Sequence, residues 1–173
     1  MTPSVKRVLM DREVRSFHDL PSGGANMSPW QQFATAVVLF YRNYFRLRGR
    51  ATRREFWWAA LFHALISVVF MVISFVVTGG EVVDISRDAL PLVLGDSVTL
   101  ASLMSTWHTL NIIPWITLLA RRFHDTDSSA ALLFTLLIPV AGLVIVIIYA
   151  LTASNPRGVR YDPPNATAAR TPT

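Results

Sequence analysis

The sequence predicts an all-α membrane protein, a polytopic helical bundle of about three spans with an N-terminal amphipathic helix in the membrane interface. Three observations predict this fold class. Hydrophobic residues make up 52% of the 173 residues and charged residues only 16%, against roughly 25% charged in typical globular domains. Three runs of 23 residues contain no Asp, Glu, Lys or Arg, at 56–78, 98–120 and 130–152. Arginines gather beside these runs, as they do on the cytoplasmic side of membrane proteins.

The segment before the first run divides into two parts. Residues 1–29 are polar, contain helix breakers such as Pro21 and Gly23-Gly24, and have no apolar stretch typical of a signal peptide. We therefore expect a mostly disordered cytoplasmic extension, with a short helix near Val5–Leu20 as the alternative to complete disorder. Residues 30–55 form the second part: aromatic and aliphatic residues recur at helical spacing from Trp30 to Leu47, followed by an Arg-rich lead-in. This pattern favours an amphipathic helix in the interface, the alternative being an ordinary helix packed on the bundle.

The first two apolar runs determine the predicted orientation. At 1.5 Å per residue, the run at 56–78 covers roughly 34 Å, enough for a hydrocarbon core of about 30 Å. Six arginines lie just before this run and two follow the run at 98–120, so both groups belong on one side of the membrane. The acidic loop 79–97 then faces outward. The N-terminus is therefore predicted to be cytoplasmic.

The third run allows two arrangements, because Pro139 and Gly142 lie near its middle. We expect residues 130–152 to cross fully, which places Arg157 and Arg160 outside. The argument is that a hairpin would leave backbone groups without partners inside the membrane. The alternative is that the chain turns back at Pro139–Gly142 and returns the tail to the cytoplasm. Residues 153–173 contain several prolines and are predicted to be extended.

Two motifs resemble those of a known family. Residues 48–57 read RGRATRREFW and open the first run, and residues 121–126 read RRFHDT and close the second. At this spacing they resemble the YhaH-like bacterial inner-membrane proteins, a family defined by domain of unknown function 805. The resemblance covers roughly residues 36–164, and Gly158–Pro163 echoes the C-terminal motif of the family. It implies a small multi-spanning protein of the bacterial inner membrane and no particular activity.

The first arginine motif contains the candidate headgroup contacts Arg50, Arg53 and Arg54. Guanidinium groups bind phosphate in bidentate geometry, so a lipid-phosphate or anionic-ligand site is one interpretation. We favour the other, which is positive-inside anchoring, because any span in this orientation requires such charges. Glu55 is expected to pair with Arg121 or Arg122 and so to join the first span to the second.

The second motif holds the densest group of polar residues: Arg121, Arg122, His124 and Asp125. Neighbouring residues on a helix point about 100° apart, so His124 and Asp125 make a poor catalytic dyad. We favour a structural turn in which Asp125 or Asp127 caps the third helix. Contact with a ligand or headgroup is the alternative. No catalytic residue, metal site or cofactor is predicted.

Three polar residues lie inside the predicted spans: His63, His108 and Asn111. Ionisable groups inside a membrane suggest function, because they are costly in lipid. Two histidines without an intramembrane carboxylate are too few for a metal site or a typical proton path. We favour interhelical hydrogen bonding for all three.

These patterns predict a non-enzymatic interaction or accessory subunit. The expected partners are a bilayer with anionic headgroups and a second copy of the chain or other membrane proteins, but not nucleic acid. An oligomeric channel or carrier for a small solute or ion is the first alternative. An enzyme acting on lipid headgroups through the His124-Asp125 turn is the second.

Overall fold

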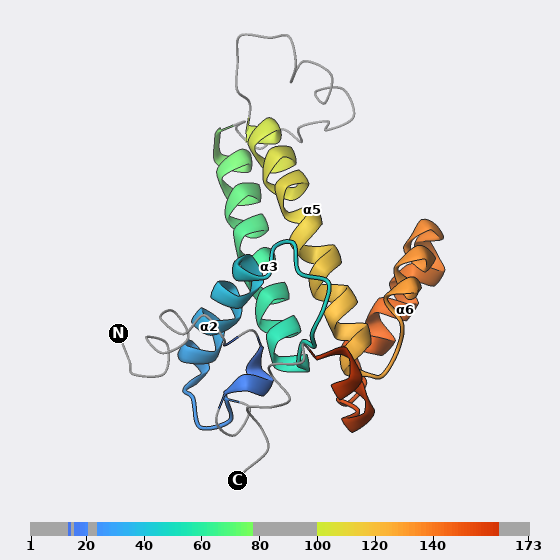
Figure 1. The fold of residues 1–173 in the computed structure, drawn as a ribbon. Coiled ribbons are helices and arrows are strands. Elements are labelled where there is room, and N and C mark those ends of the chain that lie inside the picture. The colour runs from blue at the N-terminus through green and yellow to red at the C-terminus, as the bar shows by residue number, and fades with distance from the viewer. Residues whose placement is uncertain (1–13, 15, 21–23, 78–99, 163–173) are drawn as a thin grey trace. The chain divides into compact units, whose positions relative to one another are not determined.

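The computed structural model of the chain describes residues 14, 16–20, 24–77 and 100–162 (Figure 1). All regular structure in these residues is helical, which confirms the predicted all-α class of a membrane helical bundle. The α-helices are α2 (Pro29–Arg42), α3 (Arg53–Val77), α5 (Leu100–Asp125) and α6 (Pro139–Leu151). Short 3-10 helices form η1 (Phe17–Asp19), η4 (Ala130–Leu137) and η5 (Pro156–Tyr161).

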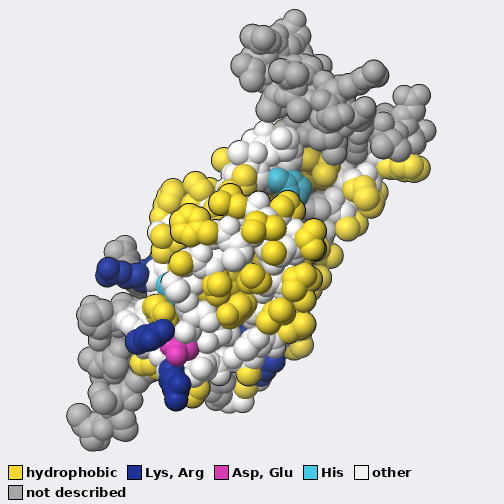
Figure 2. Space-filling model, turned by 90° about the vertical axis from the view of Figure 1, so that its right-hand side faces the viewer, with side chains coloured by type: hydrophobic (Ala, Val, Ile, Leu, Met, Phe, Trp, Pro, Cys, Tyr) yellow, Lys and Arg dark blue, Asp and Glu magenta, His cyan; other side chains and the backbone are white. Residues whose placement is uncertain are grey.

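Helix α3 is the described helix that is both long and apolar enough to cross a membrane, over Arg53–Ile73. Its start is fixed by the Thr52 side chain, whose Oγ1 accepts a hydrogen bond from the Glu55 backbone N–H at 3.2 Å. Helix α6 is apolar but shorter. On the face drawn in Figure 2, hydrophobic side chains cover a broad area and basic side chains gather apart from it.

The chain divides into two compact units, and α3 and α5 contribute residues to both. The first unit comprises residues 1–60 and 113–173, and the second comprises residues 61–112. In the first unit, one apolar cluster joins η1 to α2, through residues that include Phe17 and Leu39. A second cluster joins all four α-helices, through residues that include Phe40, Phe56 and Leu118.

The described part of residues 1–29 is folded, so the expectation of disorder is wrong there. Phe17 is fully buried in the first apolar cluster. A capping box between Ser16 and Asp19 closes η1, with the Ser16 N–H donating to Asp19 Oδ2 at 2.9 Å. Gly24 has a φ of +74°, and a Cβ there would lie 2.8 Å from the Phe17 ring. The remaining residues of this segment lie outside the described ranges.

Helix α2 starts one residue before the expected Trp30 and ends at Arg42, short of the expected Leu47. Ser28 is the N-cap in a capping box with Gln31, and Pro29 occupies the first turn. Leu39 and Phe40 are buried on one side of the helix, whereas Trp30 remains 74% exposed. Insertion of this exposed aromatic surface into a membrane interface remains a prediction.

The expected third span is not one helix, and this part of the prediction is wrong. Residues 130–137 form η4, the backbone is extended at Ile138, and α6 runs from Pro139 to Leu151. The start and the end of this segment meet, because the Ser128 hydroxyl donates to the Tyr149 hydroxyl at 3.2 Å. Arg122 also hydrogen-bonds the Thr152 carbonyl oxygen. The segment is therefore a hairpin, drawn in orange in Figure 1, whose two ends lie together.

Local chemistry explains why the hairpin forms. Proline has no N–H and disfavours helical backbone in the residue before it, so Pro139 ends η4 and starts α6. Gly142 permits the close return, since a Cβ there would lie 2.7 Å from the Leu136 Cα. Ile138 pairs both of its backbone groups at the turn: its N–H donates to the Thr135 carbonyl at 3.0 Å, and its carbonyl accepts from the Gly142 N–H at 2.7 Å. The hairpin forms although no side chain caps the start of α6, where Pro139 in the first turn leaves one N–H fewer to pair.

The tail, expected to be extended and on the outer side, is folded back onto the arginine motifs. Residues 156–161 form η5, which Asn155 caps by accepting from the Arg157 N–H at 3.0 Å. The Gly49 N–H donates to the Tyr161 carbonyl at 3.0 Å. The described part of the tail therefore lies against the lead-in to α3. The tail can lie there because the hairpin brings the chain back to the end of α5, where the hairpin began.

A buried charge network at the arginine motifs

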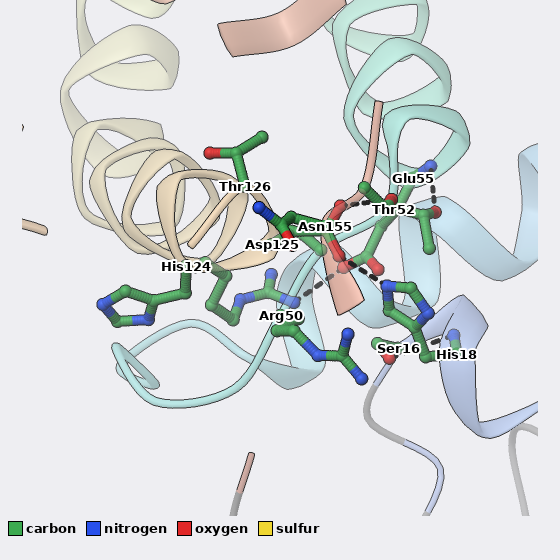
Figure 3. A network of polar contacts seen from close by, with 12 residues as sticks. Ser16, His18, Arg50, Thr52, Glu55, His124, Asp125, Thr126 and Asn155 are labelled. Carbon is green, nitrogen blue, oxygen red and sulfur yellow. Dashed lines mark hydrogen bonds and ion pairs between the residues drawn. The ribbon is translucent and has the colours of Figure 1, made fainter. Parts of the chain in front are cut away.

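The two arginine motifs meet in the first unit, around the last turn of α5. This turn, Arg121–Asp125, continues the helix beyond the predicted boundary at residue 120. The loop before α3, η1 and the segment after α6 pack around it, as Figure 3 shows. Four charged side chains here are at most 1% exposed: Glu55, Arg121, Arg122 and Asp125. Burying charges is costly unless they are paired, so the identity of each partner is decisive.

Glu55 pairs with Arg121, one of the two partners considered from the sequence. Arg121 Nη1 donates to Glu55 Oε1 at 2.7 Å, and both side chains are almost fully buried. The backbone reinforces this contact, because the Ala51 N–H donates to the Arg121 carbonyl at 3.0 Å. The pair joins the start of α3 to the end of α5.

Arg122 points into a different set of partners. Its guanidinium pairs with Asp125, three residues later on the same helix. It also donates to the carbonyl oxygens of Ala51 and Thr152. One arginine thus connects the lead-in to α3, the end of α5 and the end of the hairpin. Burial lowers the pKa of Arg122, and the neighbouring Asp125 carboxylate opposes that shift.

Asp125 lies at the centre of the network. Besides Arg122, its carboxylate contacts His18 Nε2 at 2.6 Å and accepts from the Ser154 hydroxyl at 2.5 Å. Its backbone carbonyl accepts from the Asn155 N–H at 2.8 Å. Asp125 therefore binds the N-terminal extension, α5 and the tail at one point.

His124 faces away from Asp125, as the geometry of a helix predicts (Figure 3). Its Nδ1 lies 3.2 Å from the Gly49 carbonyl oxygen, and its ring stacks on Tyr161 with centroids 4.1 Å apart. Burial lowers the pKa of His124, and the nearby Arg160 acts in the same direction, whereas the hydrogen bond to Gly49 opposes both. The neutral form is therefore favoured in the folded protein. His124 and Asp125 do not form a dyad.

Arg50 is buried with a partner from the tail. It donates two parallel hydrogen bonds to Asp162, at 3.0 and 2.8 Å, and both side chains are at most 7% exposed. Such bidentate pairs are the strongest geometry available to arginine. Gly158 lets the tail approach, since a Cβ there would clash with the His124 carbonyl oxygen.

The other two candidate arginines, Arg53 and Arg54, are exposed at the start of α3. Arg53 donates to the Leu151 carbonyl at 3.2 Å, and Trp57 Nε1 donates to the Ala150 carbonyl at 3.3 Å. Arg53, Trp57 and Arg122 thus bind the carbonyl oxygens at the C-terminal end of α6. Cationic donors are favoured at such helix C-termini.

The three intramembrane candidates lie in the second unit. His108 on α5 is 3.3 Å from the Ser67 hydroxyl on α3, and its Nδ1 is 2.8 Å from the Met104 carbonyl. The expected interhelical hydrogen bond is thus present for His108. Asn111 instead donates within its own helix, to the Trp107 carbonyl at 2.7 Å. The His63 ring packs against the Trp107 ring at a centroid distance of 5.7 Å.

The sequence analysis missed four members of the network: His18, Ser154, Tyr161 and Asp162. Nothing local marks His18 or Ser154, whereas the resemblance of Gly158–Pro163 to the C-terminal family motif pointed to the tail. The expected cap also differs. Ser129, rather than Asp125 or Asp127, caps η4, by accepting from the Ala131 N–H at 3.2 Å.

The network offers little for catalysis. Its carboxylates are occupied by arginine and histidine, and the hydroxyl of Ser154 donates to Asp125 rather than facing a general base. No group of three or more metal-ligating side chains occurs among the described residues. The network instead joins five segments of the chain, namely η1, the lead-in to α3, the end of α5, the end of the hairpin and the tail.

Comparison with known proteins decides the family. Residues 44–163 match the family described as protein of unknown function (DUF805). The chain belongs to this family. Inner membrane protein YhaH of Escherichia coli (strain K12) is 31% identical over 128 residues, which is 70% of this chain and 88% of that protein. Inner membrane protein YhaI of the same strain is 27% identical over 120 residues, which is 69% of this chain and 86% of that protein. No solved structure matches.

The family match places the network in context. Both arginine motifs, the hairpin and the tail up to Asp162 lie within residues 44–163. Helix α2 and η1 precede that range. His18 therefore reaches Asp125 from a part of the chain outside the family match.

Proposed function

We propose that this DUF805 protein is a non-enzymatic interaction or accessory subunit of the bacterial inner membrane, acting with a second copy or with another membrane protein. The observation that carries the proposal is the inward pairing of its charges. Arg50, Arg121, Arg122 and Asp125 all bind partners within the chain. Groups committed in this way hold the helices in place and are not free to act on a substrate.

The apolar exterior supports the same proposal. Described side chains on α3, α5 and the hairpin remain widely exposed, among them Val76 at 70%, Ile112 at 53% and Val140 at 77%. Such side chains fit lipid or the apolar surface of a partner. Similarity to inner membrane proteins YhaH and YhaI supports the location.

Photo-crosslinking in intact cells tests the interaction. A photoreactive amino acid is placed singly at Val76, Ile112 or Val140, with Trp30 on α2 as an exposed aromatic position outside the apolar runs. We expect a discrete protein adduct from at least one of the three positions, identified by mass spectrometry. Adducts with lipid alone at every position would contradict the proposal, as would solute flux or phospholipid turnover by the purified protein.

The orientation we propose is multi-pass, with a cytoplasmic N-terminus and the tail on that same side. Arginine placement supports the first part, and the Arg50–Asp162 pair supports the second. Single cysteines can be placed at Asp127, Arg157 and Asp88 in this cysteine-free chain. In intact spheroplasts, an impermeant maleimide should label position 88 and spare positions 127 and 157. Labelling of 157 without 127 would contradict the shared side.

A further inference from the structure

A groove of about 350 Å³ lies at the start of α3, lined by Arg53, Arg54, Trp57, Trp58 and Leu151. Its lining contains two guanidinium groups and no carboxylate. Unlike Arg50, Arg121 and Arg122, Arg54 makes no ion pair or hydrogen bond to any described part of the chain. Its charge is therefore available to a ligand.

The walls of the groove are held in place by hydrogen bonds. Trp57 Nε1 donates to the Ala150 carbonyl, and Trp58 Nε1 donates to Gln32 Oε1, each at 3.3 Å. Both indoles have thus used their donors, and Trp57 still exposes 47% of its surface. Arg53 is partly engaged with the Leu151 carbonyl. Arg54 is consequently the main group that can bind an anion.

An apolar stripe leads away from the groove along α6. Val144, Ile147, Ile148 and Leu151 follow the i, i+3, i+4, i+7 spacing of one helix face. All four are between 45% and 58% exposed. A ligand that fits both features has an anionic head for Arg54 and hydrocarbon for the stripe.

We propose that this groove binds the phosphate of an anionic phospholipid, with an acyl chain lying along α6. Arginine binds phosphate through a planar fork of donors, and tryptophan is favoured at the level of the headgroups. Basic pockets between membrane helices bind anionic headgroups in this way. The proposal depends on the membrane location of the chain and not on its role as an interaction subunit.

The test compares phosphatidylglycerol with phosphatidylcholine of identical acyl chains. Binding to the full chain in detergent is measured by native mass spectrometry, and glycerol phosphate is the soluble competitor. We expect phosphatidylglycerol to bind more tightly and Arg54→Gln to weaken it roughly fivefold, equivalent to about 1 kcal/mol for one basic residue near a membrane surface. Arg54→Lys should retain part of the preference, because it keeps the charge and loses the fork.

Matched controls separate a built site from general attraction to positive charge. Arg48 is exposed and likewise makes no ion pair or hydrogen bond within the described residues, so Arg48→Gln removes the same charge outside the groove. We expect it to change affinity less than twofold. Leu151→Ser should weaken the binding of both lipids equally, because it shortens the apolar stripe.

The proposal would be overturned by equal losses of affinity in Arg48→Gln and Arg54→Gln, or by equal binding of the two lipids. Displacement by an equal concentration of glycerol phosphate would reassign the groove to soluble phosphates.

Discussion

The two units of this protein use polar side chains in opposite ways. In the first unit, Glu55, Arg121, Arg122 and Asp125 are buried as charged pairs. Among the described residues of the second unit, buried or bridging polar groups include His63, His108 and Asn111, all of which can remain uncharged. Helices α3 and α5 contribute to both units, so the difference is not one of helix type.

The difference follows from the surroundings of each stretch of helix. The charges of the first unit stand at the ends of the apolar runs, next to loops whose carbonyls can bind them, as Ala51 and Thr152 bind Arg122. The second unit contains most of the first two apolar runs, residues 61–78 and 98–112, where an unpaired charge inside a membrane would cost several kcal/mol or more. Charge pairs therefore join the helix ends in the first unit, whereas the Ser67–His108 contact, between neutral groups, links α3 to α5 in the second.

Breaking the Glu55–Arg121 pair should have the largest effect. Replacing either residue alone by Leu leaves the other as a buried unpaired charge, which costs about 3–5 kcal/mol. We expect this loss in the free energy of unfolding, measured by denaturant titration in detergent. The double replacement should cost less than either single one, because no charge is left unpaired. Additive losses would show that the pair is not the source of the effect.

Removing His18 tests whether the N-terminal extension belongs to the network. His18→Leu deletes one partner of Asp125 but leaves Arg122 and Ser154 in place, so we expect a smaller loss of about 1–3 kcal/mol. Hydrogen exchange should rise in residues 16–20, while α5 keeps its protection. Unchanged exchange in that segment would mean that Phe17, rather than His18, holds it.

Acid should weaken the attachment of the tail through His124. Its pKa is lowered in the folded protein, so the unfolded chain binds more protons as pH falls below the usual histidine pKa of about 6.5. The contribution of neutral His124 to stability is complete above that pH and is lost progressively as pH falls toward the folded pKa. Unfolding followed from pH 8 to 5 should show less pH dependence in His124→Asn than in the parent chain. Identical profiles would contradict this.

The smallest effect is expected in the second unit. Ser67→Ala removes the hydrogen bond between α3 and His108, and such bonds between membrane helices average about 0.6 kcal/mol. The free energies of unfolding of Ser67→Ala and Glu55→Leu, measured in the same denaturant titration, give this comparison directly. A Ser67→Ala loss as large as the Glu55→Leu loss would remove the distinction between the units.

Several features could be predicted from sequence because their signals are local. Charge-free runs of helical length located α3 and α5, since burial in lipid depends on composition along one stretch of chain. Apolar spacing from Trp30 predicted the start of α2 to within one residue, and the structure adds the Ser28–Gln31 capping box that the sequence analysis did not use. Glu55 was predictable as the partner of Arg121 or Arg122, because all three lie at the same end of neighbouring apolar helices, and the structure selects Arg121.

The hairpin shows where local signals became ambiguous. Pro139 and Gly142 suit a kinked span and a turn equally well, and the choice depended on whether the turn could satisfy its own backbone. Hydrogen bonds of Ile138 to Thr135 and Gly142 pair part of that backbone. That outcome depends on the three-dimensional approach of η4 and α6.

The sequence by itself determined the class of the protein: an apolar helical chain with arginines beside its apolar runs and two motifs of one family. Only the tertiary structure decided which charges pair, because partners such as His18 with Asp125 and Arg50 with Asp162 lie more than a hundred residues apart. Hydropathy and charge act along a few turns of chain, whereas pairing requires that a segment return to one place. Once the hairpin returns the tail, Arg50 is buried against Asp162 while Arg54 stays exposed.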